Sequence, residues 1–111
     1  MNWIPLTTEA QLNEIMLQSA HRPQIIFKHS TRCATSAMVK GRLERNEAPD
    51  SMDFYYLDLI SYRDLSNKIA ETFKVYHESP QLLLIKNGAC VYEESHYGIT
   101  MEDAVEQALA A

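Results

Sequence analysis

The sequence predicts an α/β fold in which a mixed central sheet of four or five strands is flanked by helices. Up to Lys74, helical spacing of apolar residues alternates with short apolar runs, as in strands joined by helical crossovers. Two further apolar runs are separated by Asn87-Gly88, a dipeptide typical of tight β-hairpins. With 111 residues the chain is long enough for one hydrophobic core, and we expect a single domain over 1–111.

The N-terminal segment is expected to form a short strand and a helix. The strand lies around residues 3–6. Thr8-Glu9-Ala10-Gln11 matches a capping box, in which the first and last residues bond each other's backbone N–H groups, and apolar residues follow at helical spacing. A helix is therefore predicted over 8–20, and Pro23 lies just beyond its end.

The central stretch begins with the mostly apolar residues 24–29, which are typical of a strand buried on both faces. A helical pattern then runs from Cys33 to about Arg45, interrupted by Gly41, whose missing side chain weakens the middle. The strand thus delivers Cys33 to the first turn of a helix, where backbone N–H groups lack partners.

After a polar loop, the aromatic and aliphatic run at 54–59 is expected to form the next strand. A helix follows that is capped within 61–64 and ends near Lys74, with apolar positions three and four residues apart. Two right-handed βαβ crossovers make a parallel section of the sheet, and the hairpin adds two antiparallel strands at one side.

The C-terminal segment contains the hairpin and a last helix. The hairpin strands cover 80–86 and 89–94, on either side of the turn. Thr100-Met101-Glu102-Asp103 provides a helix cap, and helical spacing continues toward the C-terminal end. The order of elements is therefore strand and helix three times, followed by two strands and a helix.

Composition and charge exclude several classes of protein. The net charge is −5 with acidic and basic residues interspersed, so no basic stripe is present for nucleic acid or an anionic membrane. The N-terminal residues form neither a basic nor a long apolar segment, and nowhere do about 18 apolar residues run together. We therefore expect a cytoplasmic protein with no nucleic-acid or membrane partner. The four histidines and two cysteines lack ligand spacing, so no metal site is expected.

Cys33 is the candidate reactive group. Thiol–disulfide exchange requires an accessible thiolate. Three features favour the thiolate: the helix N-terminus, the adjacent Arg32 guanidinium, and the Ser36 hydroxyl, which lies one turn away and can donate a hydrogen bond to sulfur. The polar residues around Cys33 argue against a buried, inert cysteine. Ser36 takes the place of the second cysteine in a C-x-x-C pattern, and a serine cannot form a disulfide. The thiol that resolves a mixed disulfide on Cys33 must therefore come from elsewhere.

The spacing argues against Cys90 as this second thiol. If Pro80 opens its strand beside Cys33, the seven residues from Pro80 to Asn87 lead away from the site and span about 20 Å at about 3.3 Å each. A disulfide needs Cα atoms within about 7 Å of each other. Cys90 is therefore interpreted as a packing residue of its strand.

Five separated motifs occur in order along nearly the whole chain: His29-Ser30-Thr31-x-Cys33-x-x-Ser36, Tyr56-Leu57-Asp58-Leu59, Arg63-Asp64-x-Ser66-Asn67, His77-Glu78-Ser79-Pro80-Gln81 and Ser95-His96-Tyr97-x-Ile99-Thr100. Together they resemble the YtxJ-like family of monothiol bacilliredoxins, which have a thioredoxin-like fold. The resemblance implies an oxidoreductase whose Cys33 accepts bacillithiol, or a similar low-molecular-weight thiol, from S-thiolated client proteins. That thiol is a co-substrate, and no bound cofactor is implied. Ala34 stands where family members often have proline.

The resemblance also implies which residues surround the substrate. The bond between Ser79 and Pro80 is cis in thioredoxin-like proteins and leaves the Ser79 backbone free to pair with a bound peptide or thiol. The alternative is a trans proline that opens an edge strand. Arg32, His96 and Thr100 complete the expected substrate-binding set, with Thr100 at a helix N-terminus that can hold part of a small thiol.

Three alternatives stay open. His29, four residues before Cys33, is either a charged imidazole that stabilises the thiolate or a strand-end histidine bonded to a neighbour. The chain as a whole is either catalytic or a non-catalytic stress-response or partner-binding module that docks a strand along Ser79 and Pro80. An iron–sulfur carrier is the third alternative, although Cys33-Ala34-Thr35-Ser36 departs from the C-G-F-S signature of monothiol glutaredoxins.

Overall fold

A five-stranded sheet forms the centre of the computed structural model, which describes residues 1–110. The strand order is β1-β3-β2-β4-β5. β1 and β2 run parallel to β3, whereas β4 is antiparallel to both β2 and β5. The strands are β1 (Ile4–Pro5), β2 (Gln24–His29), β3 (Asp53–Asp58), β4 (Gln81–Lys86) and β5 (Ala89–Ser95). The predicted mixed sheet, with its parallel section and its antiparallel hairpin, is confirmed.

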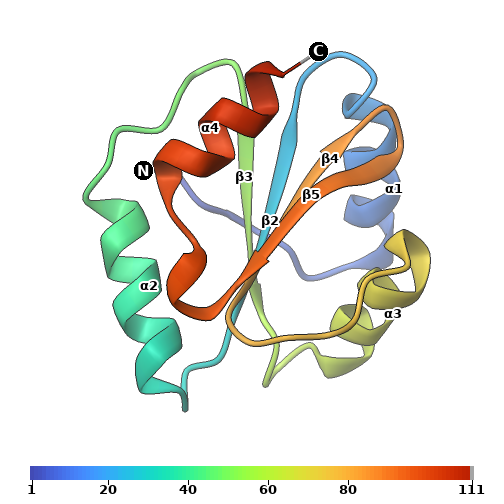
Figure 1. Cartoon of the computed structure of the whole chain (residues 1–111). Helices are drawn as coiled ribbons and strands as arrows, with labels where there is room; N and C mark the ends of the chain where they lie inside the picture. The colour runs from blue at the N-terminus through green and yellow to red at the C-terminus, as the bar shows by residue number, and fades with distance from the viewer. Residues whose placement is uncertain (111) are drawn as a thin grey trace.

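Four helices cover the sheet, α2 and α4 on one face and α1 and α3 on the other (Figure 1). Each face buries its own apolar cluster. Successive residues of β2 alternate between the two clusters, so that Phe27 faces α2 and α4 while Ile26 faces α1 and α3. The helical elements are α1 (Glu9–Gln18), α2 (Ala34–Glu44), α3 (Arg63–Phe73), the short 3₁₀ turn η1 (His96–Gly98) and α4 (Met101–Leu109).

Local sequence signals account for three of the element ends. Thr8 and Gln11 form the predicted capping box at the start of α1. Thr100 Oγ1 accepts a hydrogen bond from Asp103 N and caps α4. Asn87 and Gly88 have positive φ angles of 52° and 77°, as a tight hairpin turn requires. These three predictions are confirmed.

Two local predictions are wrong, the first because a nearby carboxylate binds the Ser61 hydroxyl and the second because core burial maintains the helix. The N-cap of α3 is Tyr62, which makes no side-chain cap bond, while Ser61 Oγ donates to the Asp58 carboxylate at 3.0 Å. α2 continues through Gly41 without interruption. Val39 and Leu43, on either side of Gly41, are buried in the core, and their burial outweighs the roughly 1 kcal/mol by which glycine disfavours a helix.

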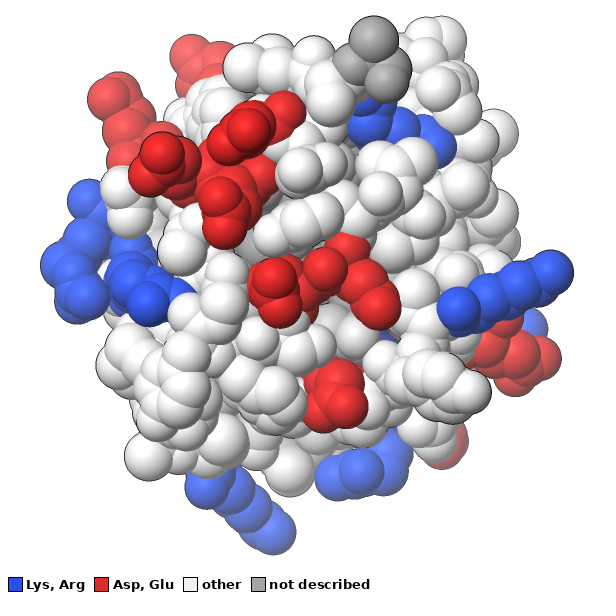
Figure 2. All heavy atoms as spheres, viewed as in Figure 1, with Lys and Arg blue, Asp and Glu red and all other residues white. Residues whose placement is uncertain are grey.

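The surface carries more acidic than basic groups on the face shown in Figure 2, where acidic side chains gather over α4 and β5. α4 carries Glu102, Asp103 and Glu106, and β5 carries Glu93 and Glu94. Basic side chains lie toward the edges of this view. No helix within residues 1–110 is long and apolar enough to cross a membrane.

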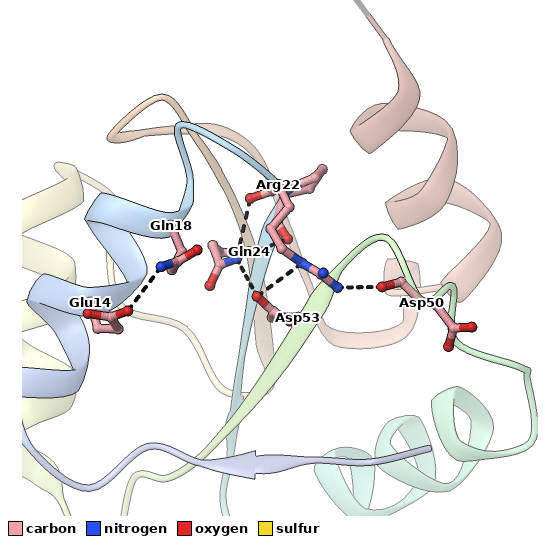
Figure 3. A network of polar contacts seen from close by, with 7 residues as sticks. Glu14, Gln18, Arg22, Gln24, Asp50 and Asp53 are labelled. Atoms are coloured by element: carbon pink, nitrogen blue, oxygen red, sulfur yellow. Dashed lines mark hydrogen bonds and ion pairs between the residues drawn. The ribbon is translucent and has the colours of Figure 1, made fainter.

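A polar cluster joins the first residues of β2 and β3 (Figure 3). Cys33 follows the other end of β2. Gln24 is completely buried, and its Nε2 donates to Asp53 Oδ2 at 2.7 Å. Arg22 Nε lies 3.3 Å from the same carboxylate oxygen, and Arg22 Nη2 donates to the backbone carbonyl of Asp50. The Asp53 carboxylate therefore connects β3 to β2 and to Arg22 in the loop that precedes β2.

Replacing Asp53 by alanine is expected to lower the free energy of unfolding by about 1–2 kcal/mol, because the buried Gln24 amide loses a charged acceptor. Urea unfolding followed by circular dichroism measures the loss. Asp50→Ala is the matched control: only the backbone of Asp50 joins the cluster, so a change below about 0.5 kcal/mol is expected. Equal losses in the two variants would contradict the role of the Asp53 carboxylate.

Candidate active site

Cys33 is the N-cap residue of α2 and ends the turn that follows β2. Its N–H donates to the Ser30 carbonyl at 3.2 Å, and its own carbonyl accepts from Ala37 N at 3.1 Å. Arg32 N donates to Ser30 Oγ at 3.3 Å, and the Arg32 residue is exposed. These bonds fix the backbone around Cys33, while its side chain stays half-buried. The structure thus places Cys33 at the N-terminal end of a helix, next to the first turn in which the sequence predicts it.

Ser36 is completely buried and bonds to the end of β2. Its Oγ accepts a hydrogen bond from Ser30 N at 3.0 Å and lies 2.6 Å from His29 Nδ1. No hydrogen bond joins Ser36 to the Cys33 sulfur within residues 1–110, because the Ser36 oxygen is engaged with His29 and Ser30. The predicted hydrogen bond to sulfur is therefore wrong in this structure. Ser36 instead holds the turn that carries Cys33.

His29 lies under this turn and is only 6% exposed. Burial, with a smaller contribution from Lys40, lowers the pKa of its imidazole below 6.5, although Asp58 acts in the opposite direction. An imidazole with a lowered pKa is neutral at pH 7. Of the two roles that the sequence leaves open for His29, the structure therefore favours the strand-end histidine bonded to a neighbour.

Ser36→Ala is expected to lower the free energy of unfolding by about 1–3 kcal/mol, because it leaves two buried groups, Ser30 N–H and His29 Nδ1, without their partner. Thermal unfolding would show a lower Tm. Thr35→Ala removes a neighbouring hydroxyl whose contact is exposed, and a change below about 0.5 kcal/mol is expected there. The assignment fails if the two variants are equally stable.

The segment before β4 lies at the same end of the sheet as Cys33, because β4 runs antiparallel to β2 and begins opposite its C-terminal end. The peptide bond between Ser79 and Pro80 is cis. The Pro80 carbonyl accepts from His96 N at 3.0 Å, and Glu78 Oε2 lies 3.1 Å from His96 Nε2. Ser79, Pro80 and His96 are thus brought together at this end of the sheet.

η1 joins this segment to α2. Tyr97 OH lies 3.3 Å from Thr35 Oγ1 in the first turn of α2, and the Tyr97 carbonyl accepts from Arg42 Nη2 at 2.7 Å. In Figure 1 the first turn of α2, the segment before β4 and the end of β5 all lie at the lower end of the sheet. Sequence reasoning missed Thr35 and Arg42, because contacts across 62 and 55 residues have no local pattern.

The hydroxyl of Thr100 caps α4, and the carbonyl of the preceding Ile99 accepts a hydrogen bond from Arg42 of α2. The hydrogen bonds of Thr100 within residues 1–110 do not include Cys33. The grouping of Thr100 with the cysteine stays a prediction.

Cys90 lies near the other end of β4, where its Cα pairs with that of Ile85. Its side chain packs against the core on the α1 and α3 side, and burial raises the pKa of its thiol. The interpretation of Cys90 as a packing residue is confirmed, and both cysteines are free. Within residues 1–110 no group of three or more His, Cys, Asp or Glu side chains is arranged to hold a metal ion.

Comparisons with known proteins identify the family and the fold of this chain. The family model described as monothiol bacilliredoxin BrxC matches residues 4–104. A solved structure of a proposed oxidoreductase with a thioredoxin fold is similar at 31% identity, with a TM-score of 0.81 over 96% of this chain and 93% of that one. The thioredoxin of Malassezia sympodialis has a TM-score of 0.78, with 98% of this chain and 92% of that chain covered. The thioredoxin of Fasciola hepatica has a TM-score of 0.74, with 93% of this chain and 97% of that chain covered. Both are 16% identical to this chain and show the fold alone. From this family match and the thioredoxin fold, the chain belongs to the monothiol bacilliredoxin family of thiol–disulfide oxidoreductases.

Proposed function

We propose that the protein removes bacillithiol, or a similar low-molecular-weight thiol, from S-thiolated client proteins through Cys33. The observation that carries this proposal is the presence of one sulfur at the site. Cys33 begins α2, Ser36 stands where a second cysteine would resolve the adduct, and Cys90 packs near the far end of β4. A site with one sulfur can accept a thiol but cannot release it through an internal disulfide. The family of the chain supports the same chemistry.

Two exchange steps complete the cycle. In the first, the Cys33 thiolate attacks the sulfur of the small thiol in the mixed disulfide, and the client cysteine leaves as a thiolate. In the second, a free small thiol attacks that same sulfur as its thiolate, forms the low-molecular-weight disulfide, and Cys33 leaves as a thiolate. The number of disulfides is unchanged in each step. The small thiol is thus a co-substrate, and the cycle uses no bound cofactor.

Ser79, Arg32 and His96 are the residues proposed to hold the substrate. The Ser79 hydroxyl oxygen is buried and has no hydrogen-bond partner within residues 1–110. Because protein atoms cover this oxygen, we expect the substrate to pair with the backbone of the same residue instead. Arg32 and His96 are exposed and can contact charged groups of the client or of the small thiol.

Mass spectrometry of the protein mixed with a bacillithiolated client tests the proposal. We expect the client to lose the adduct and the peptide that contains Cys33 to gain it. An adduct on Cys90, or a client that keeps its adduct while it stays bound, would overturn the proposal, and the second result would indicate a partner-binding module. Reduction of thiolated proteins suits the cytoplasmic location that the sequence predicts.

His96→Ala is expected to raise KM for the thiolated client by about three- to tenfold with little change in kcat, because it removes one polar contact to the bound substrate. Steady-state release of the client thiol measures both constants. His21→Ala provides the control, since His21 is exposed in the loop before β2, at the other end of that strand from Cys33. An unchanged KM in His96→Ala would remove His96 from the substrate site.

A further inference from the structure

Lys28 is a completely buried lysine on β2, five residues before Cys33. Its Nζ donates to the Ser66 carbonyl of α3 at 3.1 Å and lies 3.4 Å from His77 Nδ1. The ion pairs within residues 1–110 do not include Lys28, so its ammonium has no carboxylate partner there. Burial lowers the pKa of this amine from 10.5 to about 8. A buried charge of this kind lowers the free energy of unfolding. Stability therefore does not explain why a lysine stands at this position.

The contact with His77 connects Lys28 to the segment that ends in Ser79-Pro80. A second contact connects the neighbouring strand to the same segment. Gln81, which follows Pro80 directly, is paired with Lys28 across β2 and β4. Its Nε2 donates to the Tyr76 carbonyl at 2.9 Å. Lys28 and its cross-strand neighbour therefore hold two successive residues, Tyr76 and His77, of the segment that faces the substrate.

We infer that Lys28 is a positioning residue that holds the segment 76–80 through His77, so that Ser79 and Pro80 are aligned with a substrate bound at Cys33. The role in substrate alignment rests on the proposed function, whereas the contact between Lys28 and His77 does not. Lys28 does not touch the reacting sulfur. An apolar side chain of similar length would avoid the cost of a buried charge, so the ammonium serves substrate binding at the expense of stability.

The charged groups around His77 come from three parts of the chain. Burial is the largest cause that lowers the pKa of His77, followed by the positive charges of Lys28 on β2 and Arg63 on α3, while Glu78 in the same segment raises it. His77 is therefore neutral at pH 7, and its Nδ1 can accept a hydrogen bond from the Lys28 ammonium. Ser66 Oγ lies 3.4 Å from the same nitrogen.

The first test compares Lys28→Met with Lys68→Met, which removes the same charge from an exposed position of α3. In steady-state exchange with a bacillithiolated client, we expect Lys28→Met to raise KM about tenfold and to leave kcat within about twofold, since one charged hydrogen bond is worth at least this factor. Lys68→Met is expected to behave as the wild type. An unchanged KM in Lys28→Met, or a fall in kcat alone, would overturn the inference.

The second test needs no activity. The imidazole proton signals of His77, followed by NMR, are expected to titrate at higher pH in Lys28→Met than in the wild type, because the positive charge that opposes protonation is gone. An unchanged titration would refute the contact itself, whereas a wild-type protein without exchange activity would refute only the proposed function. If Lys28→Met does not fold, His77→Ala removes the exposed partner of the same contact. This variant is expected to raise KM by the same factor of about ten. A wild-type KM in His77→Ala would overturn the inference.

Discussion

Cys33→Ser is expected to lower the rate of exchange with a thiolated client by more than about a thousandfold, the largest effect of any single change in the chain. A serine oxygen cannot form the disulfide that links the protein to the small thiol, so the first step has no product to form. The change adds little strain, because Cys33 is half-buried and its backbone bonds do not involve the side chain. Fluorescent labelling of the released client thiol measures the rate.

Cys90→Ser is the matched control for the same measurement, and it is expected to exchange at the wild-type rate. Burial raises the pKa of the Cys90 thiol, which keeps it protonated at neutral pH, and the residue lies near the far end of β4. A comparable loss of rate in Cys90→Ser would mean that both sulfurs take part, and the cycle with one sulfur at the site would be wrong.

Much of the fold follows from signals that act over a few residues. Thr8 and Gln11 lie within one helical turn, and Asn87 and Gly88 form a two-residue turn by themselves, so each signal works wherever the rest of the chain lies. The side-chain cap predicted within 61–64 does not form, because the Ser61 hydroxyl donates to the Asp58 carboxylate three residues earlier. A capping pattern places a hydroxyl near the start of a helix but does not show which of several nearby groups it bonds.

In the candidate site, too, some features could be predicted from the sequence and others could not. The position of Cys33 at the start of α2 could be predicted because the strand and the helix are adjacent in sequence. Ser36 bonds to His29 and not to the Cys33 sulfur, and the contact between Lys28 and His77 spans 49 residues. Helical spacing places Ser36 on the same helix face as Cys33, but spacing alone does not show which neighbour takes the hydroxyl.

The buried Lys28 ammonium is expected to make the stability of the protein rise with pH. The pKa of its amine is about 8 in the folded chain against an ordinary value of 10.5. Between these pH values the unfolded chain binds more protons at this residue than the folded chain, so the free energy of unfolding increases with pH. At about 1.4 kcal/mol per pKa unit, the full increase is roughly 3 kcal/mol. Below pH 8 the whole cost is present, and above pH 10.5 it is gone.

Lys28→Met separates the contribution of Lys28 to this pH dependence from the contributions of all other groups, which the two proteins share. Because the methionine carries no proton, the variant is expected to be more stable than the wild type by about 1–3 kcal/mol at pH 7, after allowance for the lost bonds to Ser66 and His77. The difference should shrink from pH 8 upward by roughly 3 kcal/mol in all by pH 10.5, so that it reaches zero below that pH and then changes sign, because the lost bonds remain. Urea unfolding of both proteins across this range measures it. A variant that is less stable than the wild type at pH 7 would mean that Lys28 stabilises the fold, and that its charge is not held at a cost for the sake of the segment at Ser79 and Pro80.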